Sequence, residues 1–274
     1  MKQETGLNEE QVKVLLDDLL ALHGYDLNNY SKASLMRRVN RLMTIDKFPS
    51  LAELQYRLRT DKNYLKRFIE EITVNVTEMF RDPTFYSILR SKVLPEIAAK
   101  PFIRVWHAGC SSGEEVYSLA IVLHEQDLLK KSLLYATDIN PNVIERAKKG
   151  IFPIAYMKEY SENYIASGGT NDFSKYYTAK YDKVIFSELL RERMIFATHN
   201  LVSDSSFNEF QLILCRNVLI YFDKDLQAKV LKLFDDSLEP LGFLGLGAKE
   251  TLKFSDIFPK YKQIEREKIW RKEK

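Results

Sequence analysis

The stretch that decides the fold is Ile103-Arg104-Val105-Trp106-His107-Ala108-Gly109-Cys110-Ser111-Ser112-Gly113, which leads into the segment 114–124. Its first six residues are typical of a short buried strand, and the two glycines bracket a tight loop before a helix. A second strand is predicted at 132–137, ending in Asp138, and Asn140-Pro141 opens a helix that reaches Lys149. This order of strand, loop, helix, strand and helix predicts the first half of a doubly wound, mostly parallel α/β sheet.

The α/β pattern is interrupted once and then resumes. Residues 151–193 are rich in Tyr and Phe and show no long helical period, so we expect a small inserted subdomain with a short helix and short strands. Pro240-Leu241-Gly242 is expected to be a turn. The remaining elements are expected in this order: strand 194–198, strand 210–215, helix 225–238, strand 243–247 and strand 263–271, the last two as a hairpin-like pair at the sheet edge.

The N-terminal residues 1–74 are expected to form a small all-helical domain. Apolar residues recur at helical spacing over 12–22, and Gly24 can close that helix. Further helices are predicted from Ser31 or Ser34, from Ser50 with Glu53 as a capping box, and over 62–72. Residues 75–100 are expected to form a linker helix, and 101–274 the α/β domain.

Composition excludes several classes of protein. The chain has 274 residues, 45% hydrophobic and 29% charged, as in an ordinary globular protein. Its two cysteines, Cys110 and Cys215, are far apart, so neither a disulfide framework nor a metal site is expected. Residues 1–10 are polar and acidic, unlike a signal peptide, and no apolar run approaches the roughly 20 residues that span a bilayer. We therefore expect a cytoplasmic protein without direct membrane insertion.

Charge is distributed unevenly over the N-terminal helices. Residues 1–30 hold two Lys and six acids, whereas residues 31–60 hold seven Lys or Arg and two acids. Arg37, Arg38 and Arg41 are expected on one side of the second helix. This stripe is either an ordinary solvated face or a docking surface for an acidic partner, and the sequence favours neither.

The loop 109–113 and Asp138 indicate the kind of ligand. The loop is neither a dinucleotide-binding nor a Walker motif, and Glu114 and Glu115 follow it, so a phosphate at this helix start is disfavoured. NAD and ATP are therefore poor candidates. Asp138 ends the next strand, where an acid can accept both hydroxyls of a ribose. Together they point to a nucleoside without phosphates, and S-adenosylmethionine fits that description.

Four motifs, in order, resemble the CheR-type chemotaxis receptor (protein-glutamate) O-methyltransferases. They are Asn75-Val76-Thr77-Glu78-Met79-Phe80-Arg81-Asp82, the segment 105–118, Ala136-Thr137-Asp138-Ile139, and Cys215-Arg216-Asn217-Val218-Leu219-Ile220-Tyr221-Phe222-Asp223. The similarity covers nearly the whole chain. Two departures are Met79, where an aromatic residue is common, and Gly247-Ala248-Lys249-Glu250, where many members have Gly-His-Ser-Glu. The second departure bears on the rim of the pocket and on substrate choice.

The resemblance implies a Rossmann-like methyltransferase domain, S-adenosylmethionine as cofactor and S-adenosylhomocysteine as product. It implies methyl transfer to glutamate side chains on the cytoplasmic helices of methyl-accepting chemoreceptors, giving methyl esters. Arg81 and Tyr221 are expected nearest the acceptor carboxylate, and Arg37, Arg38 and Arg41 against the receptor. In some relatives a receptor tail docks on the inserted subdomain by strand addition. The residues implied to bind the cofactor are Asn75, Thr77, Arg81, Gly109, Glu115, Asp138, Asn200, Leu201, Asn217 and Val218.

The residue inventory agrees with this chemistry. A glutamate carboxylate is ionised at pH 7 and needs no general base, so positioning should suffice. His107, His124 and His199 are interpreted as structural, and at least one of Glu114 and Glu115 as stabilising only the helix dipole.

Two alternative functions are compatible with parts of the sequence. One is a non-catalytic S-adenosylmethionine-binding signalling module. The other, a nucleic-acid methyltransferase, is disfavoured by a net charge of only +3 and by the lack of an Asn/Asp-Pro-Pro-aromatic segment. We expect a monomer with no nucleic-acid partner.

Overall fold

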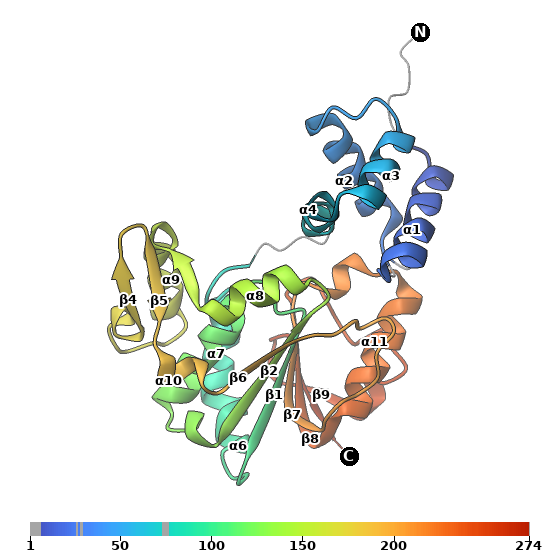
Figure 1. Cartoon of the computed structure of the whole chain (residues 1–274). Helices are drawn as coiled ribbons and strands as arrows, with labels where there is room; N and C mark the ends of the chain where they lie inside the picture. The colour runs from blue at the N-terminus through green and yellow to red at the C-terminus, as the bar shows by residue number, and fades with distance from the viewer. Residues whose placement is uncertain (1–6, 26, 28–29, 73–76, 274) are drawn as a thin grey trace. The chain divides into compact units, whose positions relative to one another are not determined.

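The computed structural model describes residues 7–25, 27, 30–72 and 77–273 (Figure 1). The chain divides into two compact units. One comprises residues 1–75 together with 220–229, and the other comprises 76–219 together with 230–274. The first is helical and the second contains the sheets.

The helical unit contains the four helices that the sequence predicts. Gly24 closes the first helix in the left-handed conformation, and the Ser50 side chain accepts a hydrogen bond from the backbone N–H of Glu53 at the start of the third. The apolar faces of the four helices form one core, which consists mainly of leucine side chains and also contains Phe68. The helices are α1 (Glu9–His23), α2 (Lys32–Ile45), α3 (Leu51–Thr60) and α4 (Lys62–Ile72).

Residues 220–229 also belong to the helical unit, which the sequence did not predict. Tyr30 forms an isolated antiparallel bridge with Phe222, and the two rings meet edge to face with centroids 5.0 Å apart. The backbone N–H of Ser31 donates to the carbonyl of Tyr221 at 2.7 Å. The helix α11 (Lys224–Ser237) is therefore divided, since its first residues group with the N-terminal helices and the others with the sheet.

The second unit is built on a seven-stranded sheet in the order β6-β2-β1-β7-β8-β10-β9. The strands from β6 to β8 are parallel, and β10 runs antiparallel to both of its neighbours. The predicted fold class, a doubly wound and mostly parallel α/β sheet, is confirmed. The strands are β1 (Ile103–Ala108), β2 (Ser132–Asp138), β6 (Met194–Thr198), β7 (Phe210–Cys215), β8 (Leu238–Leu246), β9 (Tyr261–Gln263) and β10 (Ile269–Lys272).

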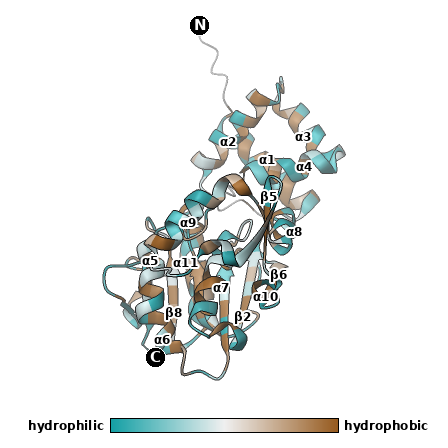
Figure 2. Cartoon of the chain, turned by 90° about the vertical axis from the view of Figure 1, so that its left-hand side faces the viewer, coloured by the Kyte–Doolittle hydropathy of each residue, from teal (hydrophilic) through white to brown (hydrophobic). Residues whose placement is uncertain are grey.

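The core of this unit lies along the central strands and the helix that follows β1. All six residues of β7 are buried, and α7 (Glu114–Glu125) is buried over most of its length. Figure 2 shows α7 and the central strands largely in brown, whereas α8 (Pro141–Lys149) carries one hydrophobic and one hydrophilic side. Helices that are apolar on most sides are typical of the interior of such a fold, so the loop before α7 has a rigid support.

The linker helix begins later than the sequence predicts. Asp82 has a φ of 56°, and the helix α5 (Pro83–Ile88) starts directly after it with proline at its first turn. A π-helical turn at Leu89–Val93 and the helix α6 (Leu94–Ile97) follow. Residues 77–82 are thus extended or turn-like, and their backbone groups pair outside a helix: the N–H of Phe80 donates to Ser118 Oγ, and the carbonyl of Arg81 accepts from Arg216.

The inserted subdomain consists of short elements, as expected. Its three-stranded antiparallel sheet has the order β3-β5-β4. The carboxylate of Glu125 in α7 accepts hydrogen bonds from the hydroxyls of Tyr164 and Tyr176 and pairs with Arg90, which fixes the subdomain to the main fold. The elements are β3 (Ile151–Pro153), α9 (Met157–Ala166), β4 (Tyr177–Lys180), β5 (Lys183–Phe186) and α10 (Glu188–Arg191).

The prediction of one strand over 263–271 is wrong. The chain reverses within this stretch, because Glu265 adopts a φ of 51° and the flanking residues pair as β9 and β10. The predicted turn 240–242 is instead an irregularity inside β8, with Leu241 at a φ of 66°. Short 3-10 turns lie at Leu129–Lys131, Ile154–Tyr156, Phe173–Tyr176, Leu219–Tyr221 and Phe258–Lys260.

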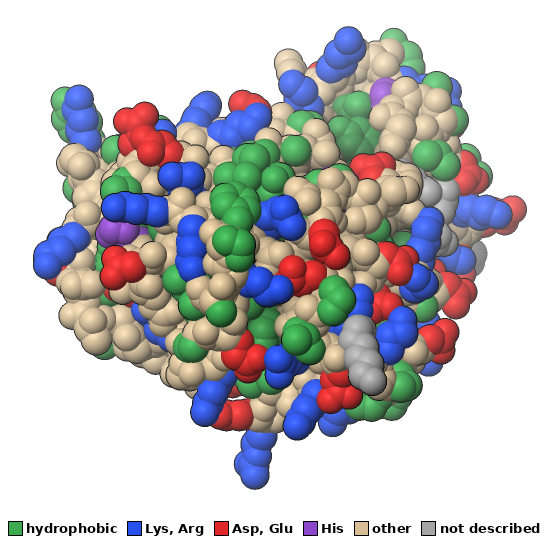
Figure 3. All heavy atoms as spheres, turned by 90° about the horizontal axis from the view of Figure 1, so that it is seen from below, with side chains coloured by type: hydrophobic (Ala, Val, Ile, Leu, Met, Phe, Trp, Pro, Cys, Tyr) green, Lys and Arg blue, Asp and Glu red, His purple; other side chains and the backbone are tan. Residues whose placement is uncertain are grey.

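The surface carries charges of both signs. On the face seen in Figure 3, basic and acidic side chains are interspersed with small apolar groups, in keeping with a net charge of +3. Within residues 7–25, 27, 30–72 and 77–273, no helix is both long and apolar enough to cross a membrane. The same residues contain no cluster of three or more side chains suited to hold a metal ion.

Candidate functional site

The loop between β1 and α7 reverses the chain with three left-handed residues. Gly109, Ser111 and Gly113 have φ values of 79°, 50° and 97°. The backbone N–H groups of Gly109 and Cys110 both donate to the carbonyl of Thr137, at 2.8 and 2.9 Å, which holds the loop against the end of β2. A Cβ atom on Gly109 would lie 2.4 Å from Cγ2 of Val218. Only glycine fits here, and two predicted cofactor-binding residues are in direct contact.

Asp138 lies at the end of β2 with only 8% of its surface exposed. Its Oδ2 accepts a hydrogen bond from the backbone N–H of Ser111, and its Oδ1 accepts one from that of Asn140, both at 2.9 Å. Burial raises the pKa of Asp138, while the backbone donors oppose that shift. A carboxylate can accept about four hydrogen bonds, and the backbone N–H groups of Ser111, Asn140 and Ile139 use part of that capacity. Asp138 can therefore still accept from a ligand hydroxyl while it orders both loops.

Glu115 lies on the first turn of α7 and already has two partners. Its Oε1 is 2.9 Å from His107 Nδ1, and its Oε2 is 3.3 Å from Nη1 of Arg216. Burial acts to raise the pKa of Glu115, but the contacts with His107 and Arg216 outweigh burial and lower it. Glu115 is therefore an anion at neutral pH. His107 is fully buried but not isolated, because it fixes this carboxylate.

Arg216 is a central residue of the site that sequence reasoning did not single out. Its Nη2 donates to the carbonyl of Arg81 at 2.9 Å and to Asp82 Oδ2 at 2.7 Å, and its Cζ lies 4.2 Å from the ring centroid of Phe85. Burial acts to lower the pKa of Arg216, but Glu115 and other nearby groups raise it above its usual value. A charged residue directly after an entirely buried strand was the available signal, since such a charge requires partners.

Of the predicted linker residues, Arg81 is brought to the same place through its backbone carbonyl. Arg216 holds the carbonyl of Arg81, and both Thr77 and Arg81 are half-buried. The structure thus brings Arg81 close to Glu115 through one shared partner. Asn75 lies outside the described residues.

The pair Asn200-Leu201 follows Asp138 across the sheet edge. The backbone N–H of His199 donates to the carbonyl of Asp138 at 3.1 Å, which places the next residues beside that strand end. Asn200 Oδ1 accepts from the N–H of Val202 at 3.0 Å, and Leu201 is buried. A local turn therefore fixes this pair next to Asp138.

Asn217 follows Arg216 with a φ of 61° and is held by Glu250. Glu250 Oε2 accepts from the backbone N–H of Asn217 at 3.0 Å and from that of Gly247 at 2.6 Å. The segment 247–250 departs from the family pattern at Ala248 and Lys249, yet it keeps the acid that joins the two loops.

Tyr221 and the α2 arginines lie in the helical unit. The Cζ of Arg38 is 5.5 Å from the centroid of the Tyr221 ring, and its Nη1 donates to the carbonyl of Ile72 at 3.2 Å. Arg37 and Arg41 are exposed, whereas Arg38 is half-buried. The predicted stripe is therefore two solvent-facing arginines and a third that has partners within its own unit.

The donor set of the second unit fits S-adenosylmethionine. A buried carboxylate with spare acceptor positions suits a ribose, and an anionic Glu115 on the first turn of α7 suits a cationic group. The acidic start of α7 is unsuited to a phosphate.

Comparisons with known proteins show the family of this chain. The model of the CheR methyltransferase SAM-binding domain matches residues 75–266, and that of the CheR methyltransferase all-alpha domain matches residues 10–73. The chain is 43% identical over 263 residues to the Cher3 protein of Pseudomonas putida, with 96% of each chain covered. It is 32% identical to a chemotaxis protein methyltransferase of Listeria innocua, covering 84% of this chain and 85% of that one. It is 31% identical to chemotaxis protein methyltransferase 1 of Pseudomonas aeruginosa, with 84% and 85% covered. The chain therefore belongs to the CheR methyltransferase family, and S-adenosylmethionine is its cofactor.

Proposed function

We propose that this protein transfers the methyl group of S-adenosylmethionine to glutamate carboxylates of chemoreceptors, forming methyl esters and S-adenosylhomocysteine. The observation that carries the proposal is a pair of acids beyond the ends of the neighbouring strands β1 and β2, in a chain of the CheR family: the buried Asp138 at the end of β2 and the half-buried Glu115 at the start of α7. Their surroundings keep one as a hydroxyl acceptor and the other as a fixed anion.

The proposed roles of the cofactor-binding residues follow from their chemistry. Asp138 accepts the ribose hydroxyls, and Glu115 faces the cationic end of the cofactor. Asn200-Leu201 and Asn217-Val218 flank the adenine, and the glycine loop at 109 lets the backbone approach the ligand. Thr77 and Arg81, together with Asn75, contact the methionine part. When bound, S-adenosylmethionine supplies an electrophilic methyl group on a positively charged sulfur.

The acceptor requires orientation rather than activation. A glutamate side chain is already a carboxylate at pH 7, so no side chain has to remove a proton. We assign to Arg81 and Tyr221 the role of orienting that carboxylate for an in-line approach, in a site that removes water from it. Support for Arg81 comes from Arg216, whose Nη2 donates to the backbone carbonyl of Arg81 and to the side-chain carboxylate of the next residue, Asp82.

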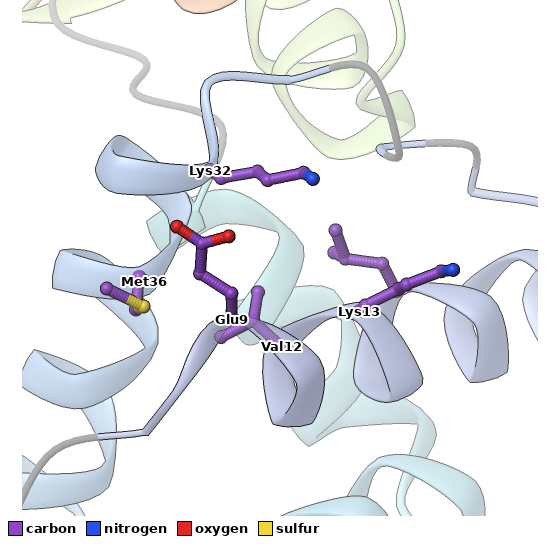
Figure 4. A pocket seen from close by; sticks show the side chains of 6 residues that line it. Glu9, Val12, Lys13, Lys32 and Met36 are labelled. Carbon is purple, nitrogen blue, oxygen red and sulfur yellow. The ribbon is translucent and has the colours of Figure 1, made fainter.

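The proposed partner is the acidic helical bundle of a chemoreceptor, and α2 offers a matching surface. Arg37 and Arg41 are exposed on it. A pocket of about 180 Å³ lies between α1 and α2, lined by apolar Val12, Leu16 and Met36, by the basic Lys13 and Lys32, and by one acid, Glu9 (Figure 4). Basic groups beside an apolar pocket suit a helix that carries both acids and apolar side chains, and such binding weakens as salt is added.

The cofactor assignment is tested by Asp138→Ala. Calorimetric titration with S-adenosylhomocysteine should show at least a ten-fold loss of affinity, because hydrogen bonds to a charged group contribute roughly 1.5–3 kcal/mol. Asp256→Ala, at an exposed acid of the same unit, is the matched control and should bind like the unmodified chain. Unchanged affinity in Asp138→Ala would refute the ribose assignment.

The reaction itself is tested with radiolabelled S-adenosylmethionine and a chemoreceptor fragment. The expected product is a base-labile methyl group on the fragment. Cofactor binding without any such product would instead favour a non-catalytic signalling module. Preferred methylation of RNA or DNA would overturn the proposed substrate.

A further inference from the structure

The chain passes from the helical unit to the sheet unit after residue 75, and it returns at residue 220. Each passage is flanked by proposed site residues: Thr77 and Arg81 follow the first, and Asn217-Val218 precede the second. The described residues of the helical unit that lie next to these two points are those up to Ile72 before the first and those from residue 220 after the second.

One side chain of α2, that of Arg38, contacts a residue of the helical unit near each of these two points in the chain. Arg38 Nη1 donates to the carbonyl of Ile72, the last residue of α4 and three residues before the first passage. The same guanidinium lies over Tyr221, the second residue after the return, with Cζ 5.5 Å from the ring centroid. A cation within about 6 Å of an aromatic centroid is attracted to the ring. Arg38 thus ties two segments that are far apart in sequence to a single helix.

Tyr221 also contacts the start of α2. The N–H of Ser31, the N-cap residue of α2, donates to the carbonyl of Tyr221 at 2.7 Å, and Tyr30 packs on Phe222. Ser31 fixes the main chain of Tyr221, and Arg38, about two helical turns further on, fixes its ring. The conformation of this tyrosine therefore depends on α2.

Arg38 differs from its two neighbours in this respect. Arg37 and Arg41 are exposed, whereas Arg38 is half-buried and its guanidinium is engaged within the helical unit. An arginine that binds a carboxylate of a partner protein should be exposed to solvent. An arginine that positions another side chain of its own chain should already contact that side chain. By this criterion Arg37 and Arg41 suit docking, and Arg38 does not.

We propose that Arg38 is a positioning residue for methyl transfer, which holds the ring of Tyr221 and the end of α4 in place, rather than a docking residue. The inference rests on the proposed function, since it takes Tyr221 to act on the acceptor. It makes α2 the element that both receives the receptor and sets the conformation of Tyr221.

Steady-state kinetics of the full chain with a chemoreceptor fragment test the role of Arg38. Arg38→Ala should lower kcat about five- to thirty-fold with little change in KM, since a cation–π contact and one hydrogen bond are lost. Arg38→Lys should recover part of kcat, because an ammonium can also sit over the ring. Arg37→Ala and Arg41→Ala are the matched controls and should raise KM. An Arg38→Ala variant that raises KM as the controls do would overturn the proposal.

Amide hydrogen exchange tests the same contacts without any substrate. Exchange of the Ser31 N–H, which Tyr221 protects, should be at least five-fold faster in Arg38→Ala than in Arg37→Ala. Equal exchange in the two variants would overturn the role of Arg38. A wild-type chain that methylates no receptor fragment would overturn the proposed function instead, so the two failures are distinguishable.

Discussion

Gly109→Ala places a methyl group where the structure has no room for one. The added Cβ would lie 2.4 Å from Cγ2 and 3.4 Å from Cγ1 of Val218. The residue also has a φ of 79°, which costs an alanine roughly 1–2 kcal/mol. Relief of the overlap by shifting the loop adds about 1–3 kcal/mol. We therefore expect Gly109→Ala to reduce the free energy of unfolding by roughly 2–5 kcal/mol, the sum of these two costs.

The two costs can be separated with a second substitution. Val218→Ala removes both γ carbons, and the atom that remains nearest, Cβ of residue 218, is 3.5 Å away, an ordinary van der Waals distance. The double variant should keep the cost of the positive φ and recover the overlap. The coupling free energy between the two positions is then about 1–3 kcal/mol in favour of the double variant.

Urea unfolding of the unmodified chain, the two single variants and the double variant measures this coupling free energy. Titration of the same four chains with S-adenosylhomocysteine gives a second coupling, this time in the free energy of binding. Gly113→Ala with Val218→Ala is the control, because Gly113 also has a positive φ but its nearest neighbour is Ala147. That pair should be additive within about 0.5 kcal/mol. If the losses in unfolding free energy from Gly109→Ala and Val218→Ala simply add in the double variant, the contact between residues 109 and 218 is refuted. The described conformation of the loop 109–113 would then be wrong as well.

Two further predictions concern buried charge. Burial raises the pKa of Glu114 to about 7, so its protonated form stabilises the folded chain fully below the usual value of 4.5, and this is lost as pH rises through 7. The free energy of unfolding of the unmodified chain should therefore fall by up to about 3 kcal/mol as pH rises from 4.5 to 7. In Glu114→Gln it should change less over the same pH range. Equal pH dependence in the two chains would contradict the raised pKa of Glu114. Arg216→Met leaves Glu115 without its cation and should cost about 3–5 kcal/mol in urea unfolding, part of which Glu115→Gln restores in the double variant. A loss below about 1 kcal/mol would show that the pair is not buried as described.

Most of the fold could be read from the sequence because its signals are local. Apolar spacing and caps define the four N-terminal helices, and a strand followed by a glycine loop defines the start of the sheet. The turn inside 263–271 was missed because its left-handed residue is Glu265, whereas a turn of this kind is usually marked by glycine or asparagine. The attachment of 220–229 to the helical unit was missed because it depends on packing against residues 30 and 31.

The site divides in the same way between local and tertiary features. Gly109 and Asp138 were found because each ends or follows a strand, which is visible in the chain itself. Arg216 was overlooked because its partners, Glu115 and Asp82, are 101 and 134 residues away in sequence. His107 was interpreted as structural although its partner Glu115 is only eight residues further on, because the two side chains meet across the tight loop between β1 and α7. Neither pairing leaves a periodic pattern in the sequence.

The buried charges explain why so few residues suffice to prepare this site. Asp82, Arg216, Glu115 and His107 form one connected chain, in which Arg216 has a side chain only 3% exposed. Burying the Arg216 guanidinium and much of Glu115 is costly, although the Asp82 side chain remains 41% exposed, and a stable protein could do without this ion pair. What the arrangement provides is a carboxylate fixed in charge and position before any ligand arrives, so that no reorganisation is needed when a cation binds. Because Arg216 also holds the carbonyl of Arg81, the residues proposed to meet the cofactor and the acceptor share one anchor, and weakening it should impair binding and transfer together.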